Sequence, residues 1–253
     1  MKLYSGRAYM AHIYSALLIA LSLAALSVQP AQAQDAGPRY KIGIIGTGKI
    51  GGALARHWVK AGHEVLISSR HPEQLQDLAR ELGPKARAGT PREAAAFGEV
   101  ILVSVPYTAM PQIGKDYAVE LAGKVVLDTG NPIERRDGPM GAEARKKGSG
   151  IASQEFLAGA RLVRAFNCIP AASLANDADR APDRIAIPIA GDDAKALEVA
   201  KQLVQDAGFS PVVVGPLASA IRFELGEELA TKQYTAMEMQ AILARPSSTA
   251  PAK

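Results

Sequence analysis

The chain has 253 residues, of which 48% are hydrophobic and 21% are charged, as is ordinary for one large or two small α/β domains. The formal net charge of +4 is small for this length, and no long basic run occurs, so the sequence argues against a nucleic-acid partner. The single Cys168 excludes an intramolecular disulfide, and no His/Cys cluster has the spacing of a metal site.

Residues 1–33 have the pattern of a secretory signal peptide. Lys2 and Arg7 precede a charge-free stretch from Ala8 to Gln34, and Ala31-Gln-Ala33 supplies the small residues that a signal peptidase reads. We expect cleavage after Ala33 and hence a periplasmic or secreted protein. Two alternatives stay open: an uncleaved segment that anchors the chain in a membrane, and a mis-assigned start, which would leave a cytoplasmic protein.

A glycine-rich motif between a strand and a helix predicts a dinucleotide-binding site. The strand begins at Lys41, and a helix is expected from Ala53 to Ala61. The first glycine of such a motif makes the turn, the second lets backbone approach a pyrophosphate, and the third lets the helix pack on the strand. The helix N-terminus adds free N–H groups. The alternative is a turn that only ends a strand. The candidate residues are Gly46, Thr47, Gly48, Lys49, Ile50 and Gly51.

The second predicted strand, Glu64 to Ser68, ends in residues that favour NADP over NAD. An NAD-dependent enzyme usually has an acidic residue there, to bind the ribose hydroxyls. This chain has Ser69 and Arg70, with no carboxylate before Glu73. A hydroxyl and a guanidinium match the oxygens of a 2′-phosphate. The alternative, in which Ser69 caps a helix and Arg70 is solvated, is compatible with phosphate binding.

The chain continues to alternate between helices and strands as far as Val214. Helices are expected at 72–82, 91–97, 108–121, 152–159 and 192–207, and strands at 99–105, 124–128, 162–166, 184–190 and 211–214. A polar, glycine-rich stretch, 133–150, interrupts the alternation. This order predicts an α/β protein with a doubly wound parallel sheet, the Rossmann NAD(P)-binding fold, over residues 38–218.

The C-terminal segment 219–245 is predicted to be a helix, and residues 246–253 are predicted to be disordered. Leu225, Leu229, Met237 and Ile242 approximate one apolar stripe along this helix. The stripe is expected to pack on the protein's own core, and the alternative is a homodimer contact.

Three strand ends carry the candidates for the nicotinamide side of the site. Val105 and Pro106 follow one strand, and Asn131 and Asn167 follow the next two. These ends converge at one edge of the predicted sheet, and an asparagine can donate to and accept from a carboxamide or a ribose hydroxyl. The alternative is a turn role for each asparagine. Cys168 is expected to be a packed residue, because no histidine is evident nearby.

No proton donor is evident for this side of the site. His12, His57, His63 and His71 all lie in the first 71 residues, and no Tyr-x-x-x-Lys motif occurs. Ketone and imine acceptors usually need such a donor. A flavin-like ring exchanges its ring-nitrogen proton with solvent, so a redox cofactor is the favoured hydride acceptor. No catalytic residue is assigned.

These motifs, in this order, resemble the coenzyme F420-dependent NADP oxidoreductases. The resemblance rests on the Gly-Thr-Gly-Lys-Ile-Gly loop, the Ser69-Arg70 pair, Val-Ser-Val-Pro106, Thr-Gly-Asn131-Pro and Ala-Phe-Asn167. It extends from about residue 40 to residue 225.

The resemblance implies NADP as the cofactor, with Thr47, Ser69 and Arg70 at its phosphates and the regions of Pro106 and Asn131 at its nicotinamide. It also implies direct hydride transfer between NADPH and a deazaflavin of the F420 type or a flavin. Two alternatives remain: an exported, non-catalytic dinucleotide-binding domain, and the NADPH-binding module of a metal or flavin reductase system.

Overall fold

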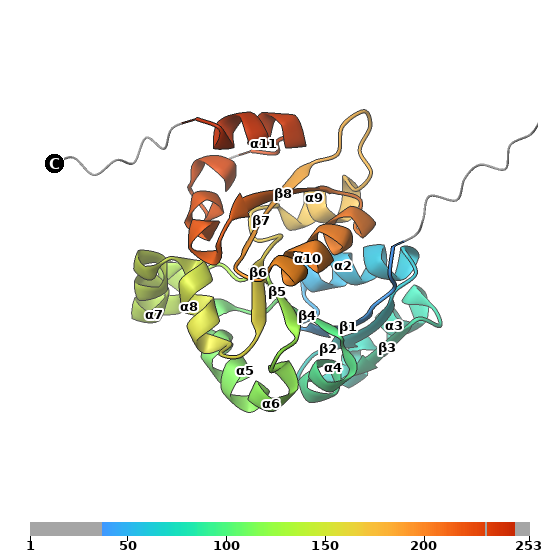
Figure 1. Cartoon of the computed structure of the whole chain (residues 1–253). Coiled ribbons are helices and arrows are strands. Elements are labelled where there is room, and N and C mark those ends of the chain that lie inside the picture. Colours follow the sequence, from blue (N-terminus) through green and yellow to red (C-terminus); the bar gives the residue numbers. More distant parts are fainter. Residues whose placement is uncertain (1–36, 231, 246–253) are drawn as a thin grey trace, which may run out of the picture. The chain divides into compact units, whose positions relative to one another are not determined.

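The computed structural model describes residues 37–230 and 232–245, and an eight-stranded sheet forms its centre (Figure 1). The strand order is β3-β2-β1-β4-β5-β6-β7-β8. The strands are β1 (Lys41–Ile45), β2 (Glu64–Ser68), β3 (Ala86–Gly89), β4 (Val100–Val103), β5 (Val125–Asp128), β6 (Arg161–Arg164), β7 (Ala186–Gly191) and β8 (Ser210–Gly215).

The predicted α/β doubly wound fold is confirmed, with one difference in strand direction. The strands β1 to β6 are parallel, but β7 pairs with β6 in the antiparallel sense and with β8 in the parallel sense. The last two strands therefore run opposite to the first six, and their carboxyl ends lie at the other edge of the sheet. Hydrophobic periodicity identifies a strand but carries no information about its direction.

Helices cover both faces of the sheet (Figure 1). The α-helices are α2 (Lys49–Lys60), α3 (Gln76–Leu82), α4 (Pro91–Phe97), α5 (Met110–Asp116), α6 (Ala118–Leu121), α7 (Glu134–Lys147), α8 (Ser149–Phe156), α9 (Ala171–Asn176), α10 (Ala194–Asp206) and α11 (Ala236–Leu243). Short 3₁₀ helices are η1 (Pro72–Leu75), η2 (Tyr107–Ala109), η3 (Leu217–Phe223) and η4 (Glu228–Ala230).

Side chains of each central strand alternate between two hydrophobic cores. In β4, Val100 and Leu102 pack in the core that α2, α3, α9 and α10 share. Ile101 and Val103 point to the opposite face and pack with α4 to α8. All four residues are buried, as expected for a parallel strand covered on both faces.

Several elements differ from their predicted bounds. The expected helix 108–121 divides into η2, α5 and α6, because Tyr117 has non-helical dihedrals at the last junction. The stretch 133–150 contains α7, whose two parts meet at Gly138 with φ of 62°. The strand β3 and the helix α9 were not predicted, because their residues show no hydrophobic periodicity. The strand is also short and rich in small residues.

The C-terminal segment packs on the protein's own core, although it is not one helix. It divides into η3, η4 and α11, and their buried side chains form a third core with one face of β7 and β8. Leu229 and Ile242 are buried there, whereas Leu225 is 36% and Met237 79% exposed. The predicted single stripe is therefore wrong at these last two positions, because helical periodicity does not continue across the breaks.

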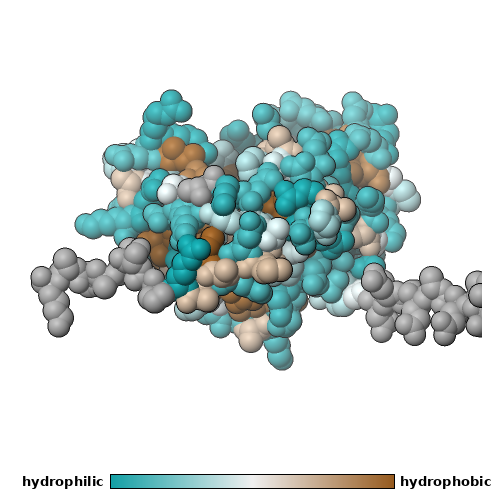
Figure 2. Space-filling model, turned by 90° about the horizontal axis from the view of Figure 1, so that it is seen from above, coloured by the Kyte–Doolittle hydropathy of each residue, from teal (hydrophilic) through white to brown (hydrophobic). Residues whose placement is uncertain are grey.

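The predicted signal peptide, residues 1–33, and the predicted tail, residues 246–253, lie outside the described residues. Within the described residues, no helix has the length and apolarity that a membrane crossing requires. The surface in Figure 2 is mostly hydrophilic, with small hydrophobic areas between the polar side chains.

Candidate functional site

The three glycines of the loop between β1 and α2 have different surroundings. A Cβ on Gly46, where φ is +96°, would lie 2.4 Å from the Ser104 carbonyl oxygen. A Cβ on Gly51 would lie 2.3 Å from the Gly46 carbonyl oxygen. The first and third glycines therefore allow close contacts within the protein. By contrast, a Cβ on Gly48 would meet no protein atom within 4 Å.

Gly48 stands before an uncapped helix N-terminus. It is the N-cap of α2, no side chain caps the helix, and the first turn contains no acidic residue. The first N–H groups of an α-helix have no partner within the helix. Together with the helix dipole they attract an anion, and the open space over Gly48 lets a phosphate approach the backbone. This loop therefore has the geometry and charge that a dinucleotide pyrophosphate needs.

Thr47 ties the glycine loop to the end of β2. Its backbone N–H and its hydroxyl both donate to the Ser68 carbonyl oxygen, at 3.1 and 3.0 Å. The Ser68 hydroxyl in turn donates to the Ile44 carbonyl oxygen at 2.6 Å. These bonds bring Ser69 and Arg70, the next two residues, to the same edge of the sheet as the loop.

The Ser69-Arg70 pair is accessible at this edge. The Ser69 hydroxyl oxygen accepts a hydrogen bond from the His71 N–H at 3.0 Å, which forms a turn before η1, and Arg70 is exposed. The Ser69 side chain thus orders the turn but does not cap the helix as its alternative required, because the N-cap of η1 is His71 and no side chain caps it. That bond uses one lone pair of the oxygen and leaves the hydroxyl hydrogen available to a ligand.

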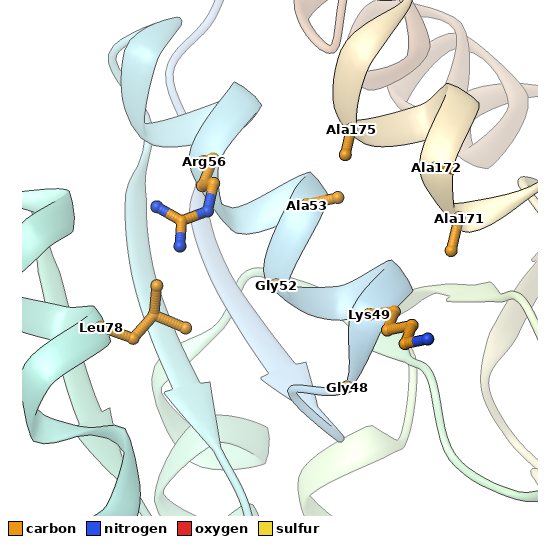
Figure 3. A pocket seen from close by; sticks show the side chains of 9 residues that line it. All are labelled: Gly48, Lys49, Gly52, Ala53, Arg56, Leu78, Ala171, Ala172 and Ala175. Carbon is orange, nitrogen blue, oxygen red and sulfur yellow. The ribbon is translucent and has the colours of Figure 1, made fainter.

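A cleft of about 550 Å³ adjoins the glycine loop on the outer side of α2. Figure 3 shows small side chains of α9 facing α2 across it, with Lys49 and Arg56 on the α2 side. Arg56 forms an exposed ion pair with Glu81 of α3. The lining residues are Gly48, Lys49, Gly52, Ala53, Arg56, Leu78, Ala171, Ala172 and Ala175.

The two predicted asparagines meet at the carboxyl ends of β5 and β6. The Asn131 side chain donates to the Asn167 carbonyl oxygen at 2.7 Å, and the Asn167 side chain donates to Asn131 Oδ1 at 3.3 Å. Asn167 also donates to the Phe223 carbonyl oxygen at 3.0 Å, while its own Oδ1 is buried without a partner. The asparagines therefore join two strand ends to η3.

Two backbone features support this arrangement. Phe166 has φ of 60°, an uncommon value for a non-glycine residue, directly before Asn167. Its ring is fixed in the core by edge contacts with Trp58 and Phe209. On the other side, Arg136 of α7 donates to the Asn131 carbonyl oxygen at 2.7 Å. Both asparagines are thus held from several directions.

Val105 and Pro106 lie at the carboxyl end of β4. A Cβ on Gly46 would come within 2.8 Å of a Val105 methyl carbon, so this residue lies against the glycine loop. Pro106 is exposed and is the N-cap of η2. The candidates after β1, β2, β4, β5 and β6 therefore all lie at one edge of the parallel part of the sheet.

Beneath the asparagines lies a buried ion pair that the sequence interpretation missed. Asp128 and Arg164 are paired residues of β5 and β6, both are 0% exposed, and their side chains form a hydrogen-bonded ion pair. A signal was available, because an arginine in a strand with both faces covered needs a buried partner. The aspartate at the end of the adjacent strand is that partner.

Tyr107 and Glu224 extend the buried polar cluster. The Tyr107 hydroxyl lies 3.1 Å from the Ser153 hydroxyl oxygen, and Glu224 Oε1 accepts from the Ser149 N–H at 2.5 Å. Burial raises the pKa of Tyr107 to about 12, so its phenol is neutral at physiological pH. Its hydroxyl is bonded to α8 and packs beneath the strand ends as part of the core.

Of the described histidines, only His71 lies at this edge, after β2, where its Nδ1 is 3.4 Å from a Glu73 carboxylate oxygen. His57 and His63 belong to the C-terminal end of α2 and the turn that follows it, where they contact Leu174 and Asp206. Burial raises the pKa of Cys168, which favours the thiol over the nucleophilic thiolate. Within the described residues, no group of three or more His, Cys, Asp or Glu side chains could hold a metal ion.

Comparisons with known proteins agree with this geometry. The sequence profile of a family described as NADP oxidoreductase, coenzyme F420-dependent, matches residues 41–132. The F420-dependent NADP reductase of Methanothermobacter thermautotrophicus is 30% identical over 194 residues, which cover 71% of this chain and 83% of that protein. Rat metalloreductase STEAP3 is 30% identical over 187 residues, covering 73% of this chain but only 36% of that protein.

Solved structures have the same fold. A hypothetical protein from Sinorhizobium meliloti has a TM-score of 0.68 at 28% identity, with 78% of this chain and 96% of that chain covered. A putative F420-dependent NADP-reductase from Arthrobacter has a TM-score of 0.60 at 24% identity, covering 72% of this chain and 87% of that chain.

Proposed function

The chain belongs to the coenzyme F420-dependent NADP oxidoreductase family, and we propose that it transfers hydride between NADPH and a deazaflavin or flavin acceptor. The observation that carries the proposal is the loop at Gly48, where open space adjoins the uncapped N-terminus of α2. This loop fits a pyrophosphate, and the dinucleotide, when bound, supplies the hydride chemistry.

The residues after β2 support NADP as the preferred dinucleotide. Ser69 and Arg70 follow the strand without an acidic residue, and the bonds of Thr47 hold them beside the loop. A guanidinium binds a phosphate through charge-assisted hydrogen bonds, whereas a carboxylate at this position would repel it. Arg70 forms no ion pair with a carboxylate among the described residues, so its charge is available for the 2′-phosphate.

At the other end of the site, the protein's part is to hold and orient the nicotinamide. The hydrogen bonds of Asn131 and Asn167 fix the edge that this ring would contact. The acidic groups near this edge, Asp128, Tyr107 and Glu224, are bonded within the protein, which fits an acceptor that takes hydride directly. Such a reaction depends on the distance and orientation of the two rings.

The first test is a titration of the purified protein with NADPH and, separately, with NADH. Arg70→Ala should weaken NADPH binding by about ten-fold or more, which corresponds to roughly 1.4 kcal/mol, and should change NADH binding little. Arg80→Ala is a matched control, because Arg80 is an exposed arginine of α3 that pairs with Asp77. Equal losses for both nucleotides would refute a 2′-phosphate contact, and a wild type that binds neither nucleotide would refute the proposed function.

A second candidate is a nucleotide-binding module that passes electrons to a metal-reducing partner. The similarity to rat metalloreductase STEAP3 favours it, because this chain spans only 36% of that protein. Stopped-flow oxidation of NADPH with free flavin, with and without a ferric chelate, separates the two candidates. NADPH oxidation that reduces the flavin without any other protein supports the first, and NADPH oxidation only when a partner protein is added supports the second.

We also propose export, on the signal pattern of residues 1–33. N-terminal sequencing of the protein from its native host tests this, since export predicts a mature chain that begins at Gln34. A mature protein that begins at Met1 in the soluble fraction would contradict it.

A further inference from the structure

The buried pair of Asp128 and Arg164 is unusual enough to need a local explanation. Both side chains are 0% exposed and lie on the face of the sheet that packs on α8. Burying two charges costs desolvation energy that their attraction often does not exceed, and a well-packed apolar pair is frequently as stable. Stability is therefore a weak reason for this pair.

The contacts of the pair centre on Gly130. Arg164 Nη2 donates to the Gly130 carbonyl oxygen at 2.6 Å. Asp128 Oδ1 accepts from the Gly130 N–H at 2.7 Å. The other oxygen of Asp128 accepts from Arg164 Nη1, so one ion pair holds both polar backbone groups of this glycine.

The ring of Tyr107 closes the remaining side of Gly130. A Cβ on this glycine would lie 3.0 Å from a Tyr107 ring carbon and 3.0 Å from Asp128 Oδ1. The backbone at Gly130 is thus restricted by charge on one side and by a buried ring on the other. The next residue is Asn131, whose side chain contacts the end of β6.

We propose that Arg164, through its pair with Asp128, is a positioning residue for the nicotinamide half of the dinucleotide site. This inference rests on the proposed function. The guanidinium contacts Gly130 and not the ligand, and its effect reaches the ligand through the backbone of residues 129–131. The adenosine half is set separately by Thr47 and Ser68, whose side chains donate to the Ser68 and Ile44 carbonyl oxygens and not to this pair.

The test compares two ligands on the same variants. NADPH uses both halves of the site, whereas adenosine 2′,5′-bisphosphate has the adenosine and the 2′-phosphate but no nicotinamide. For Arg164→Met and Arg164→Lys we expect NADPH affinity to fall by about ten-fold or more, in line with the cost of misplacing a binding group by an ångström. Affinity for the bisphosphate should stay within about two-fold of wild type, since its contacts lie elsewhere.

The control variant is Arg161→Met. Arg161 lies on the same strand, β6, and also forms a two-bonded ion pair, with Asp193 at 2.9 and 2.7 Å, but at the other end of the strand. Its loss should leave the ratio of the two affinities unchanged. The fluorescence of bound NADPH gives a second readout, because a displaced nicotinamide emits differently while a loss of global stability alone does not change the emission of the folded complex.

The outcomes separate the inference from the function on which it rests. A wild type that binds neither ligand refutes the proposed function. A wild type that binds both, with Arg164 variants that keep the wild-type affinity ratio and emission, refutes the positioning role. If Arg164→Met does not fold, Arg164→Lys decides, because it keeps the positive charge but cannot reproduce the guanidinium's separate bonds to Asp128 and Gly130.

Discussion

Replacing Gly48 and Gly51 with alanine, one at a time, should separate binding from stability. Both changes add the same methyl group within one loop, and both reduce the entropy of the unfolded chain by the same amount. The two sites differ in what the new Cβ meets. At Gly48 it meets nothing within 4 Å, and at Gly51 it lies 2.3 Å from a backbone oxygen.

The magnitudes follow from these surroundings. Gly48 has φ of −83°, which alanine adopts readily, so the Gly48→Ala variant should unfold with a free energy within about 1 kcal/mol of wild type, after a small N-cap loss. In Gly51→Ala, α2 must move away from the Gly46 turn. Such overpacking costs about 1–3 kcal/mol, or roughly 2–4 °C of Tm per kcal/mol.

For NADPH affinity the order is the opposite of that for stability: Gly48→Ala should lose more than Gly51→Ala. The methyl group at position 48 occupies the space that a pyrophosphate needs, so the loss of about one or two charge-assisted hydrogen bonds should weaken NADPH by about 100-fold. Gly51→Ala, where it is folded, should bind more nearly like wild type.

Stability and affinity are measured separately. The chain has a single tryptophan, Trp58, which is buried in α2 and donates to the Leu203 carbonyl oxygen at 2.8 Å. Its emission reports urea unfolding, and isothermal titration reports NADPH affinity. A folded Gly48→Ala variant with wild-type affinity would refute the path of the pyrophosphate over this residue.

Two further predictions concern stability alone. Burial lowers the pKa of His63 below its ordinary 6.5, and Nδ1 accepts from the Tyr40 N–H. As the pH falls, His63 is therefore protonated in the unfolded chain before it is protonated in the folded protein. The contribution of neutral His63 to the free energy of unfolding should be fully present above about pH 6.5 and should decrease below that pH. Urea titrations from pH 7.5 to 5.5 should show a smaller fall for His63→Asn, and equal falls would contradict the assignment. Gly114→Ala should destabilise the protein by about 1–3 kcal/mol, since its Cβ would lie 1.7 Å from the Phe156 carbonyl oxygen. The matched helical change Gly52→Ala, with only one contact at 4.0 Å, should instead stabilise it by about 0.5–1 kcal/mol, and a thermal melt distinguishes the two signs.

The sequence predicted the parts of the fold whose signals are local. The strand at Lys41–Ile45, the glycine loop and the strand at Glu64–Ser68 follow from β-branched runs and turn chemistry within a few residues. The helix Pro91–Phe97 begins with Thr90 and Glu93, which form a capping box. Such patterns can be identified in a sequence because the residues that interact are neighbours in the chain.

What the sequence did not predict depends on distant contacts. The helix α7 contains Gly138, Pro139 and Gly141, which disfavour a continuous helix, and its Arg145 donates to the Leu225 carbonyl oxygen 80 residues away. The direction of β7 and β8 depends on the connection between β6 and β7, which determines the edge of the sheet at which β7 begins. Arg164 has no local partner, because Asp128 is 36 residues away.

The two halves of the site also differ in when the chain can complete them. The phosphate loop closes over 21 residues, between Thr47 and Ser68. The other half needs Asn167 with Phe223, 56 residues apart, and Ser149 with Glu224, 75 residues apart. Local contacts form early in folding and distant ones late, and synthesis proceeds from the N-terminus. A nascent chain can therefore complete the contacts around the glycine loop well before those around Asn167, which wait for the segment that contains Phe223 and Glu224.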